Sequence, residues 1–295
     1  MKAAVFFVVC EGEFEIGLDA LQSLVDSLKG YEIDVFILDD GSPSFVGQNI
    51  AKKLNTGGIQ EIHHMDLAVS LGFRGSAQRA FIGLSWIHKT AKKFDVIIKI
   101  DADAVVLRED LGQHIQETLQ GRRGLYGVEY SMRKRDKILY IADQFPIGLT
   151  RRLVNGIIQR AWRIGRTYQV WWSDIGKKAR LNGYKYSYIQ GCFWFLGANT
   201  LHELVEANYL DRDQSNFGFV FNDDLILTTA TMAIQHPVVD LTKVSNAWRC
   251  SMTLSESTPI GVIQAQKPYV IHPLKNHHAA NVRREEFKKL FPHSS

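Results

Sequence analysis

The chain has 295 residues, of which 45% are hydrophobic and 22% are charged, and its formal net charge is +4 at pH 7. These values are ordinary for a globular protein that buries one large core or two modest ones, and they exclude fibrous and disordered classes. The three cysteines stand far apart without a Cys-x-x-Cys pair, which argues against a disulfide framework or zinc knuckle and indicates a reducing, cytoplasmic compartment.

The first predicted element is a buried strand over 3–10, followed by a helix that ends at Lys29. The apolar N-terminal stretch is too short for a signal peptide, and glutamates follow where a small-residue cleavage site belongs. A second strand over 33–38 runs into Asp39-Asp40-Gly41-Ser42. Carboxylates and open amides at the carboxyl end of a strand are typical of a ligand site in an open α/β sheet, although a plain polar turn uses the same residues.

The next elements continue this alternation, with a helix over 46–54, a short strand over 59–62 and a helix over 77–93. Arg74 and Arg79 lie near the start of the last helix, where an arginine either meets a phosphate or base or is solvated. The order of strands and helices predicts a parallel sheet covered by helices.

An apolar run from Phe94 to Ile100 predicts a strand buried on both faces, and it leads into Asp101-Ala102-Asp103. If the strand continues, the two carboxylates point the same way and repel each other unless a cation lies between them. The pattern favours Mg²⁺ or Mn²⁺, with phosphate oxygens on the remaining positions. Two solvated aspartates in a turn are the alternative, and 211–213 repeats the Asp-x-Asp pattern in a polar stretch.

The residues from Val35 to Ser42, followed about sixty residues later by Ile97 to Asp103, resemble the nucleotide-sugar half of the A-fold glycosyltransferases, particularly family 2 and its relatives. The resemblance implies an α/β fold with a mostly parallel central sheet flanked by helices and an appended acceptor-binding region. It also implies that Asp40 contacts the nucleotide base, that Asp101 faces the ribose or metal, and that Asp103 ligates the metal. The full nucleotide-sugar set is Val9, Cys10, Glu11, Asp40, Arg74, Arg79, Asp101, Ala102, Asp103 and Lys275.

Segment 131–185 carries the positive charge of the chain, with 13 Lys and Arg against 3 Asp and Glu. Residues 149–172 are predicted to form an amphipathic helix with a basic face and interleaved aromatics. Three hypotheses fit this pattern: a surface for the anionic head of a lipid acceptor at a membrane, a nucleic-acid site, and a solvated helix face with tryptophans in the core. No nucleic-acid motif is present, which disfavours the second.

The acceptor side begins with a predicted strand over 192–197, where the resemblance implies that Gly191 and Trp194 border the acceptor pocket, although a core tryptophan is the alternative. Asp223-Asp224 is similar to the Glu-Asp-x-x-Leu element of the family, which implies that Asp224 is the general base with Asp223 beside it. A carboxylate in hydrogen-bond reach can take the proton of a sugar hydroxyl, which is a poor nucleophile near neutral pH. Two N-terminal helix aspartates favoured by the helix dipole are the competing explanation.

A short apolar strand near the C-terminus ends in His272, and the resemblance implies that His272 is a third metal ligand and that Lys275 offsets diphosphate charge. We therefore predict metal-dependent transfer, with inversion, of a sugar from a UDP-linked donor to an acceptor hydroxyl. Residues 1–110 form the nucleotide-sugar half, and 111–295 form the acceptor-binding and catalytic half of the same domain. The alternatives are a basic binding module for anionic lipid or nucleic acid, and a sugar-phosphate nucleotidyltransferase, whose Gly-x-Gly-x-Arg loop is missing here.

Overall fold

The computed structural model describes residues 1–72, 75–119, 121–131, 166–185, 187–210, 223–245, 247–248, 258–274 and 278–290. Strands and helices alternate through the first hundred residues, as the sequence pattern predicts. The elements are β1 (Lys2–Val9), α1 (Phe14–Ser27), β2 (Glu32–Asp39), α2 (Val46–Lys53), β3 (Ile59–Asp66), α3 (Ser76–Lys89), β4 (Val96–Ile100), β5 (Val105–Val106), α4 (Leu111–Thr118), β6 (Leu125–Ser131), α7 (Arg166–Leu181), β7 (Ser187–Gly197), α8 (Ala198–Glu206), α9 (Asp223–Ala233), β8 (Val238–Asp240), a 3₁₀ turn η3 (Leu241–Lys243), α10 (Ile260–Gln266), β9 (Val270–Ile271) and α11 (His278–Leu290).

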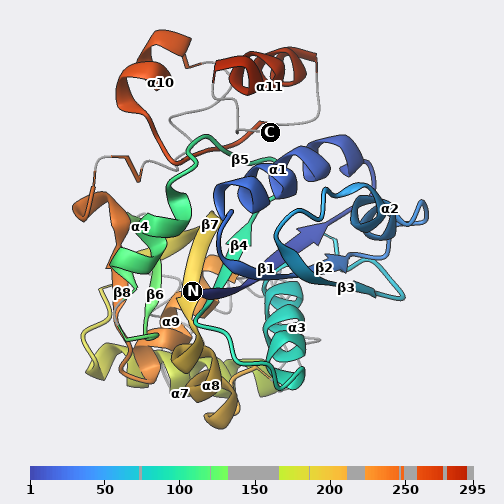
Figure 1. Ribbon diagram of the computed structural model, residues 1–295. Coiled ribbons are helices and arrows are strands. Elements are labelled where there is room, and N and C mark those ends of the chain that lie inside the picture. Colours follow the sequence, from blue (N-terminus) through green and yellow to red (C-terminus); the bar gives the residue numbers. More distant parts are fainter. Residues whose placement is uncertain are drawn as a thin grey trace, which may run out of the picture.

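A seven-stranded sheet in the order β3-β2-β1-β4-β7-β6-β8 forms the centre of the molecule (Figure 1). The first four strands are parallel, β7 runs antiparallel to β4 and β6, and β8 is parallel to β6. The mostly parallel α/β architecture is therefore confirmed. Because β7 is antiparallel, its first residues lie at the edge where β1, β2 and β4 end.

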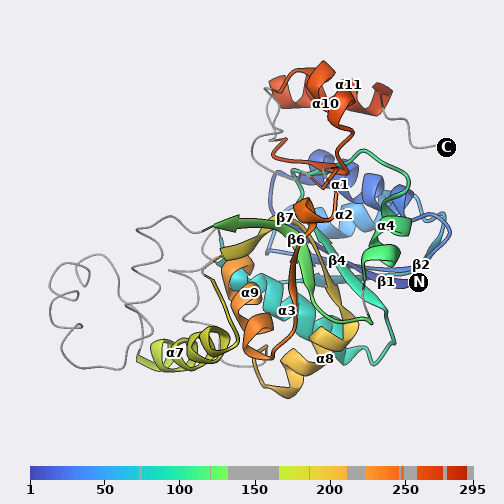
Figure 2. The ribbon, with the colours of Figure 1, turned by 90° about the vertical axis from the view of Figure 1, so that its left-hand side faces the viewer.

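Helices cover both faces of this sheet, which explains the nearly continuous apolar runs in its central strands (Figure 2). Along β1, Val5 and Phe7 face a core shared with α1, α2 and α4. The alternate residues Ala4 and Phe6 face a second core shared with α3, α7, α8 and α9. Among the described residues, no helix combines the length and hydropathy required to cross a bilayer.

The C-terminal part adds a smaller third core beyond one end of the sheet. β5 and β9 pair as a two-stranded antiparallel sheet, and α10 and α11 lie together beside it (Figure 1). Val105, Ile271 and Phe287 are buried in this core. The pairing brings the chain after β9 back to the Asp-x-Asp segment.

The predicted basic helix over 149–172 falls largely outside the described residues. α7 starts at Arg166 and continues to Leu181, so the predicted end at Trp172 is wrong. Ile175 and Ala179 are buried in the second core, so the apolar face of the helix continues beyond Trp172.

Candidate active site

The two aspartates of the Asp-x-Asp segment are brought together by a turn, and not by strand alternation. β4 ends at Ile100, and the Asp101 amide makes one last sheet contact with the carbonyl of Cys192 at 3.0 Å. The amide of Ala104 then donates to the Asp101 carbonyl at 3.1 Å, which closes the turn. Asp103 is buried, while the Asp101 side chain is 36% exposed.

His272 reaches this turn because β9 pairs with β5. Val105 lies opposite Ile271, and the amide of Leu274 donates to the carbonyl of Asp103 at 2.7 Å. These contacts place the His272 Nε2 atom 3.1 Å from Asp103 Oδ1 and 3.9 Å from Asp101 Oδ2. Residues separated by about 170 positions in the chain thus meet at one edge of the sheet.

Asp101, Asp103 and His272 form a donor set that fits a divalent metal. Each offers one ligand atom, and these atoms all lie within 4.8 Å of one another. Carboxylates suit Mg²⁺ and Mn²⁺, and an imidazole is more usual for Mn²⁺ and later transition metals than for Mg²⁺. The structure therefore brings together the three residues that the sequence grouped, and the set fits Mn²⁺ better than Mg²⁺.

Lys99 is a further member of this site that the sequence analysis missed. Its ammonium donates hydrogen bonds to Asp101 Oδ1 and to the carbonyl of Gly191, and the residue is 4% exposed. A single lysine inside an apolar strand, two residues before an aspartate on the same face, was the available signal. The carbonyl of Gly191 accepts this hydrogen bond, and the expected place of Gly191 beside the acceptor pocket stays a prediction.

Asp40 and Arg79, both predicted to bind the nucleotide, contact each other. Arg79 Nη1 lies 2.8 Å from Asp40 Oδ2 and 2.6 Å from the carbonyl of Gly72. Asp40 is 2% exposed and also accepts hydrogen bonds from Ser70 Oγ and the Leu71 amide. The pair therefore joins the loop after β2 to the loop between β3 and α3, and a nucleotide contact of either residue stays a prediction.

The turn after Asp40 depends on a glycine. Gly41 has φ +68°, and a Cβ there would lie 2.6 Å from the Ser70 amide nitrogen. We expect Gly41→Ala to lower the free energy of unfolding by about 1–3 kcal/mol, because alanine is strained at this positive φ and its Cβ would crowd the backbone of Ser70. Urea denaturation measures this change. Gly12→Ala is the matched control: φ is +81° but nothing lies within 4 Å, so an equal loss in both variants would show that the contact adds nothing.

Cys10, also in the predicted nucleotide-sugar set, is half-buried. Burial, with a smaller contribution from Glu13, raises the pKa of Cys10 to about 12. We expect iodoacetamide at pH 8 to alkylate Cys10 at least about a hundredfold more slowly in the native protein than in urea, because the thiolate is the nucleophile. Mass spectrometry of the Cys10 peptide gives both rates, and equal rates would contradict the burial argument.

The neighbours of Cys10 differ in exposure. Val9 is buried in the first core, and Glu11 is exposed and accepts a hydrogen bond from Ser44 Oγ at 2.7 Å. Ala102 is buried between the two aspartates of the turn. Arg74 and Lys275 lie outside the described residues.

α9 places Asp224 at the same edge of the sheet as Asp101. The hydroxyl of Thr228 donates to the Asp224 carbonyl at 2.6 Å and accepts from the Ile189 amide at 3.0 Å. Ile189 belongs to the part of β7 that precedes Gly191, the residue that contacts Lys99. The first turn of α9, which begins at Asp223, is thereby fixed to the β7 segment beside the turn.

Trp194 does not lie where an acceptor sugar can stack on it. It is 1% exposed and packs in the second core, opposite Lys99 in the β4–β7 register. The expectation of an acceptor contact is corrected to the alternative, a core tryptophan, because no ring face is accessible.

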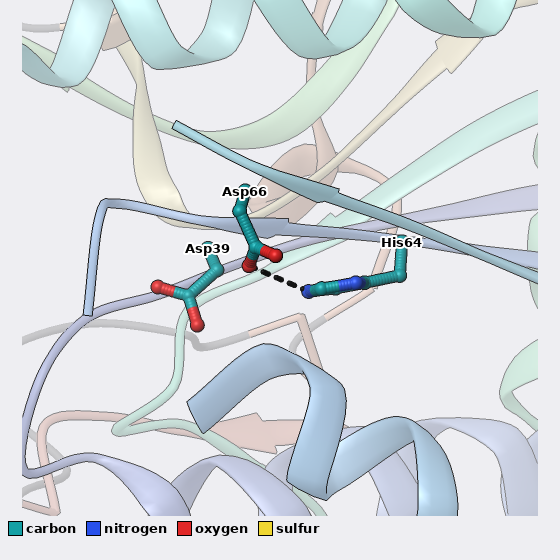
Figure 3. Close-up of side chains that lie close together, drawn as sticks. All are labelled: Asp39, His64 and Asp66. Carbon is teal, nitrogen blue, oxygen red and sulfur yellow. Dashed lines mark ion pairs between the residues drawn. The ribbon is translucent and has the colours of Figure 1, made fainter. Parts of the chain in front are cut away.

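A second group of possible ligands, Asp39, His64 and Asp66, lies between β2, β3 and α2 (Figure 3). His64 Nε2 pairs with Asp66 Oδ1 at 2.9 Å. Both Asp39 oxygens already accept backbone hydrogen bonds, from Ser42 at 2.8 Å and Gly47 at 2.7 Å. Asp39 thus holds its loop and the start of α2.

No family model matches the chain, and no curated protein matches it. Among solved structures, WbbM, described as a bifunctional glycosyltransferase, aligns with 99% of this chain and 50% of its own, at TM-score 0.50 and 11% identity. The galactosyltransferase LgtC aligns with 98% of this chain and 96% of its own, at TM-score 0.49 and 13% identity. The mannosyltransferase PcManGT of Pyrobaculum calidifontis aligns with 97% of this chain and 61% of its own, at TM-score 0.45 and 12% identity.

The likeness to WbbM concerns the fold. This chain spans about half the length of that protein. The predicted A-type glycosyltransferase fold is confirmed. At this identity the comparison shows the fold alone.

Proposed function

We propose that this protein transfers a sugar from a nucleotide-diphosphate donor, UDP-linked, to an acceptor hydroxyl. The observation that carries the proposal is the convergence of Asp101, Asp103 and His272 at the carboxyl edge of an A-type glycosyltransferase fold. Open α/β sheets bind their ligands at this edge. Residues 1–110 would hold the donor, and 111–295 would hold the acceptor.

The metal in this proposal is Mn²⁺, with Mg²⁺ as the second choice, held by Asp101, Asp103 and His272. Bound there, it would balance the charge of the departing diphosphate, with Lys275 as a second cation. Asp40 and Arg79 would line the donor site through the loops that they fix. These roles follow from the donor set and its place in the fold.

Asp224 is the proposed general base, with Asp223 beside it. Its support is the attachment of α9 to the β7 segment next to the Asp101 turn. The base would take the hydroxyl proton as the acceptor oxygen bonds to the anomeric carbon and the bond from that carbon to the diphosphate breaks. A single displacement from the face opposite the diphosphate inverts the configuration. Proton NMR of the first-formed product tests the stereochemistry, and a retained configuration would remove Asp224 from this role.

The acceptor in this proposal is lipid-linked or anionic, and basic segment 131–185 is its binding region at a cytoplasmic membrane face. The charge of that segment supports the assignment. Flotation of the full chain with anionic and neutral vesicles tests it. Equal recovery with both kinds of vesicle would count against it.

Thermal-shift measurements with a panel of nucleotide sugars, each with and without Mn²⁺, test the proposed function itself. We expect stabilisation by one nucleotide class, and a larger shift when Mn²⁺ is present, because ligands that bind only the native state stabilise it. UDP alone and GDP alone serve as the nucleotide controls. The absence of any shift with every nucleoside diphosphate would refute the assignment.

A further inference from the structure

Lys99 is a buried cation at the proposed metal site. Lysine is almost never fully buried unless it is paired, and Lys99 is 4% exposed in the middle of the sheet. Its ammonium donates to Asp101 Oδ1, just after β4, and to the carbonyl of Gly191 within β7. The positive charge is therefore held in a fixed place at the edge of the cluster.

The two carboxylate oxygens of Asp101 have different neighbours. Oδ1 bonds to Lys99, and Oδ2 lies on the side of His272, 3.9 Å from its Nε2 atom. Asp103 Oδ1 lies 3.1 Å from the same nitrogen. Asp101 is thus paired with Lys99, and Asp103 is paired with His272.

We propose that Lys99 sets the charge of the site so that Mn²⁺ and the nucleotide diphosphate bind together and the metal alone binds weakly. The inference rests on the proposed function. With His272 neutral, the charges of Asp101, Asp103 and Lys99 sum to one unit negative, and a bound divalent ion brings that sum to one unit positive; buried Arg284, whose charge acts on Asp103, is unchanged in every variant compared. Without the lysine charge, the cluster is two units negative alone and neutral with the ion.

This charge count predicts opposite effects on the two ligands. A fixed ammonium bonded to a ligating carboxylate repels a divalent ion at close range, and the same charge attracts the diphosphate. Loss of the lysine charge therefore tightens binding of the metal alone and weakens binding of the diphosphate to the metal-loaded site. A role that is only structural gives weaker binding of both ligands.

Lys99→Gln tests the proposal, because glutamine keeps a donor for Gly191 and removes the charge, and Lys99→Arg is the charged counterpart. Electron paramagnetic resonance of free Mn²⁺ gives the metal affinity, and calorimetry at saturating Mn²⁺ gives the UDP affinity. For Lys99→Gln we expect about tenfold tighter Mn²⁺ binding and about tenfold weaker UDP binding. Lys99→Arg keeps the positive charge, so both of its affinities are expected to lie closer to those of the wild type than the affinities of Lys99→Gln do.

Lys2→Gln is the matched control, since Lys2 begins β1 at the opposite end of the strands and pairs with Glu32 at 4.0 Å. It is expected to change neither affinity. Unchanged or jointly weakened affinities in Lys99→Gln, with a wild type that binds both ligands, overturn the role of Lys99 and leave the proposed function standing. A wild type that binds neither Mn²⁺ nor UDP or GDP removes both.

Discussion

Replacing Asp103 by asparagine is expected to reduce Mn²⁺ affinity and Mn²⁺-dependent UDP release at least about a hundredfold. Changing a residue that merely supports a metal ligand already costs about 10- to 100-fold, and Asp103 is a proposed ligand itself. The substitution removes a charge and weakens the 3.1 Å contact with His272, but it keeps the shape of the side chain. The turn is also held by the backbone bond from Leu274 to the Asp103 carbonyl, so the fold should persist.

Asp66→Asn is the matched control for this experiment, because Asp66 belongs to the second histidine–carboxylate group (Figure 3). It is expected to leave Mn²⁺ affinity and UDP release unchanged. If Asp66→Asn removes metal binding and Asp103→Asn does not, the metal site has been assigned to the wrong cluster. Circular dichroism of both variants checks that they are folded.

The sequence predicted the strands and helices of the first hundred residues well, because most of these strands are buried on both faces and therefore appear as apolar runs. β3 is the exception, predicted over 59–62 and observed over Ile59–Asp66. Its second part is polar, with His63 and His64, and it forms because it pairs with β2 in register, as between Ile37 and His64. Backbone pairing at an edge strand is not visible in side-chain hydropathy.

The candidate site was predictable only in part, since its parts are joined by contacts distant in sequence. Asp101 and Asp103 stand out in the sequence because they follow an apolar strand. The position of His272 depends on the pairing of β5 with β9, in which each strand contributes only two residues. That histidine was selected through the family resemblance. Trp194 was misassigned because a tryptophan at the edge of a core and one inside it have the same sequence pattern.

Replacing Asp224 by asparagine is expected to lower the rate of sugar transfer by about 10²–10⁴-fold, the usual contribution of a general base. Mn²⁺ affinity and UDP affinity should stay unchanged, because the proposed metal ligands and Lys99 lie on other elements. Transfer to acceptor is measured under saturating donor, and UDP binding is measured by calorimetry on the same preparation. A parallel loss of UDP binding would place Asp224 in the donor site.

Asp223→Asn separates the base role from a purely electrostatic role at the start of α9. A helix N-terminus is stabilised by a carboxylate by about 0.3–1 kcal/mol, and this contribution is lost in either variant. If helix stabilisation is the whole function of the pair, Asp223→Asn and Asp224→Asn will lower the free energy of unfolding and the transfer rate to similar small extents. The base role requires a rate loss at Asp224 that far exceeds the loss at Asp223, with equal stability. Thr228 supports the base role of Asp224 because its hydroxyl joins the first turn of α9 to Ile189 in β7, which holds this turn beside the proposed acceptor side.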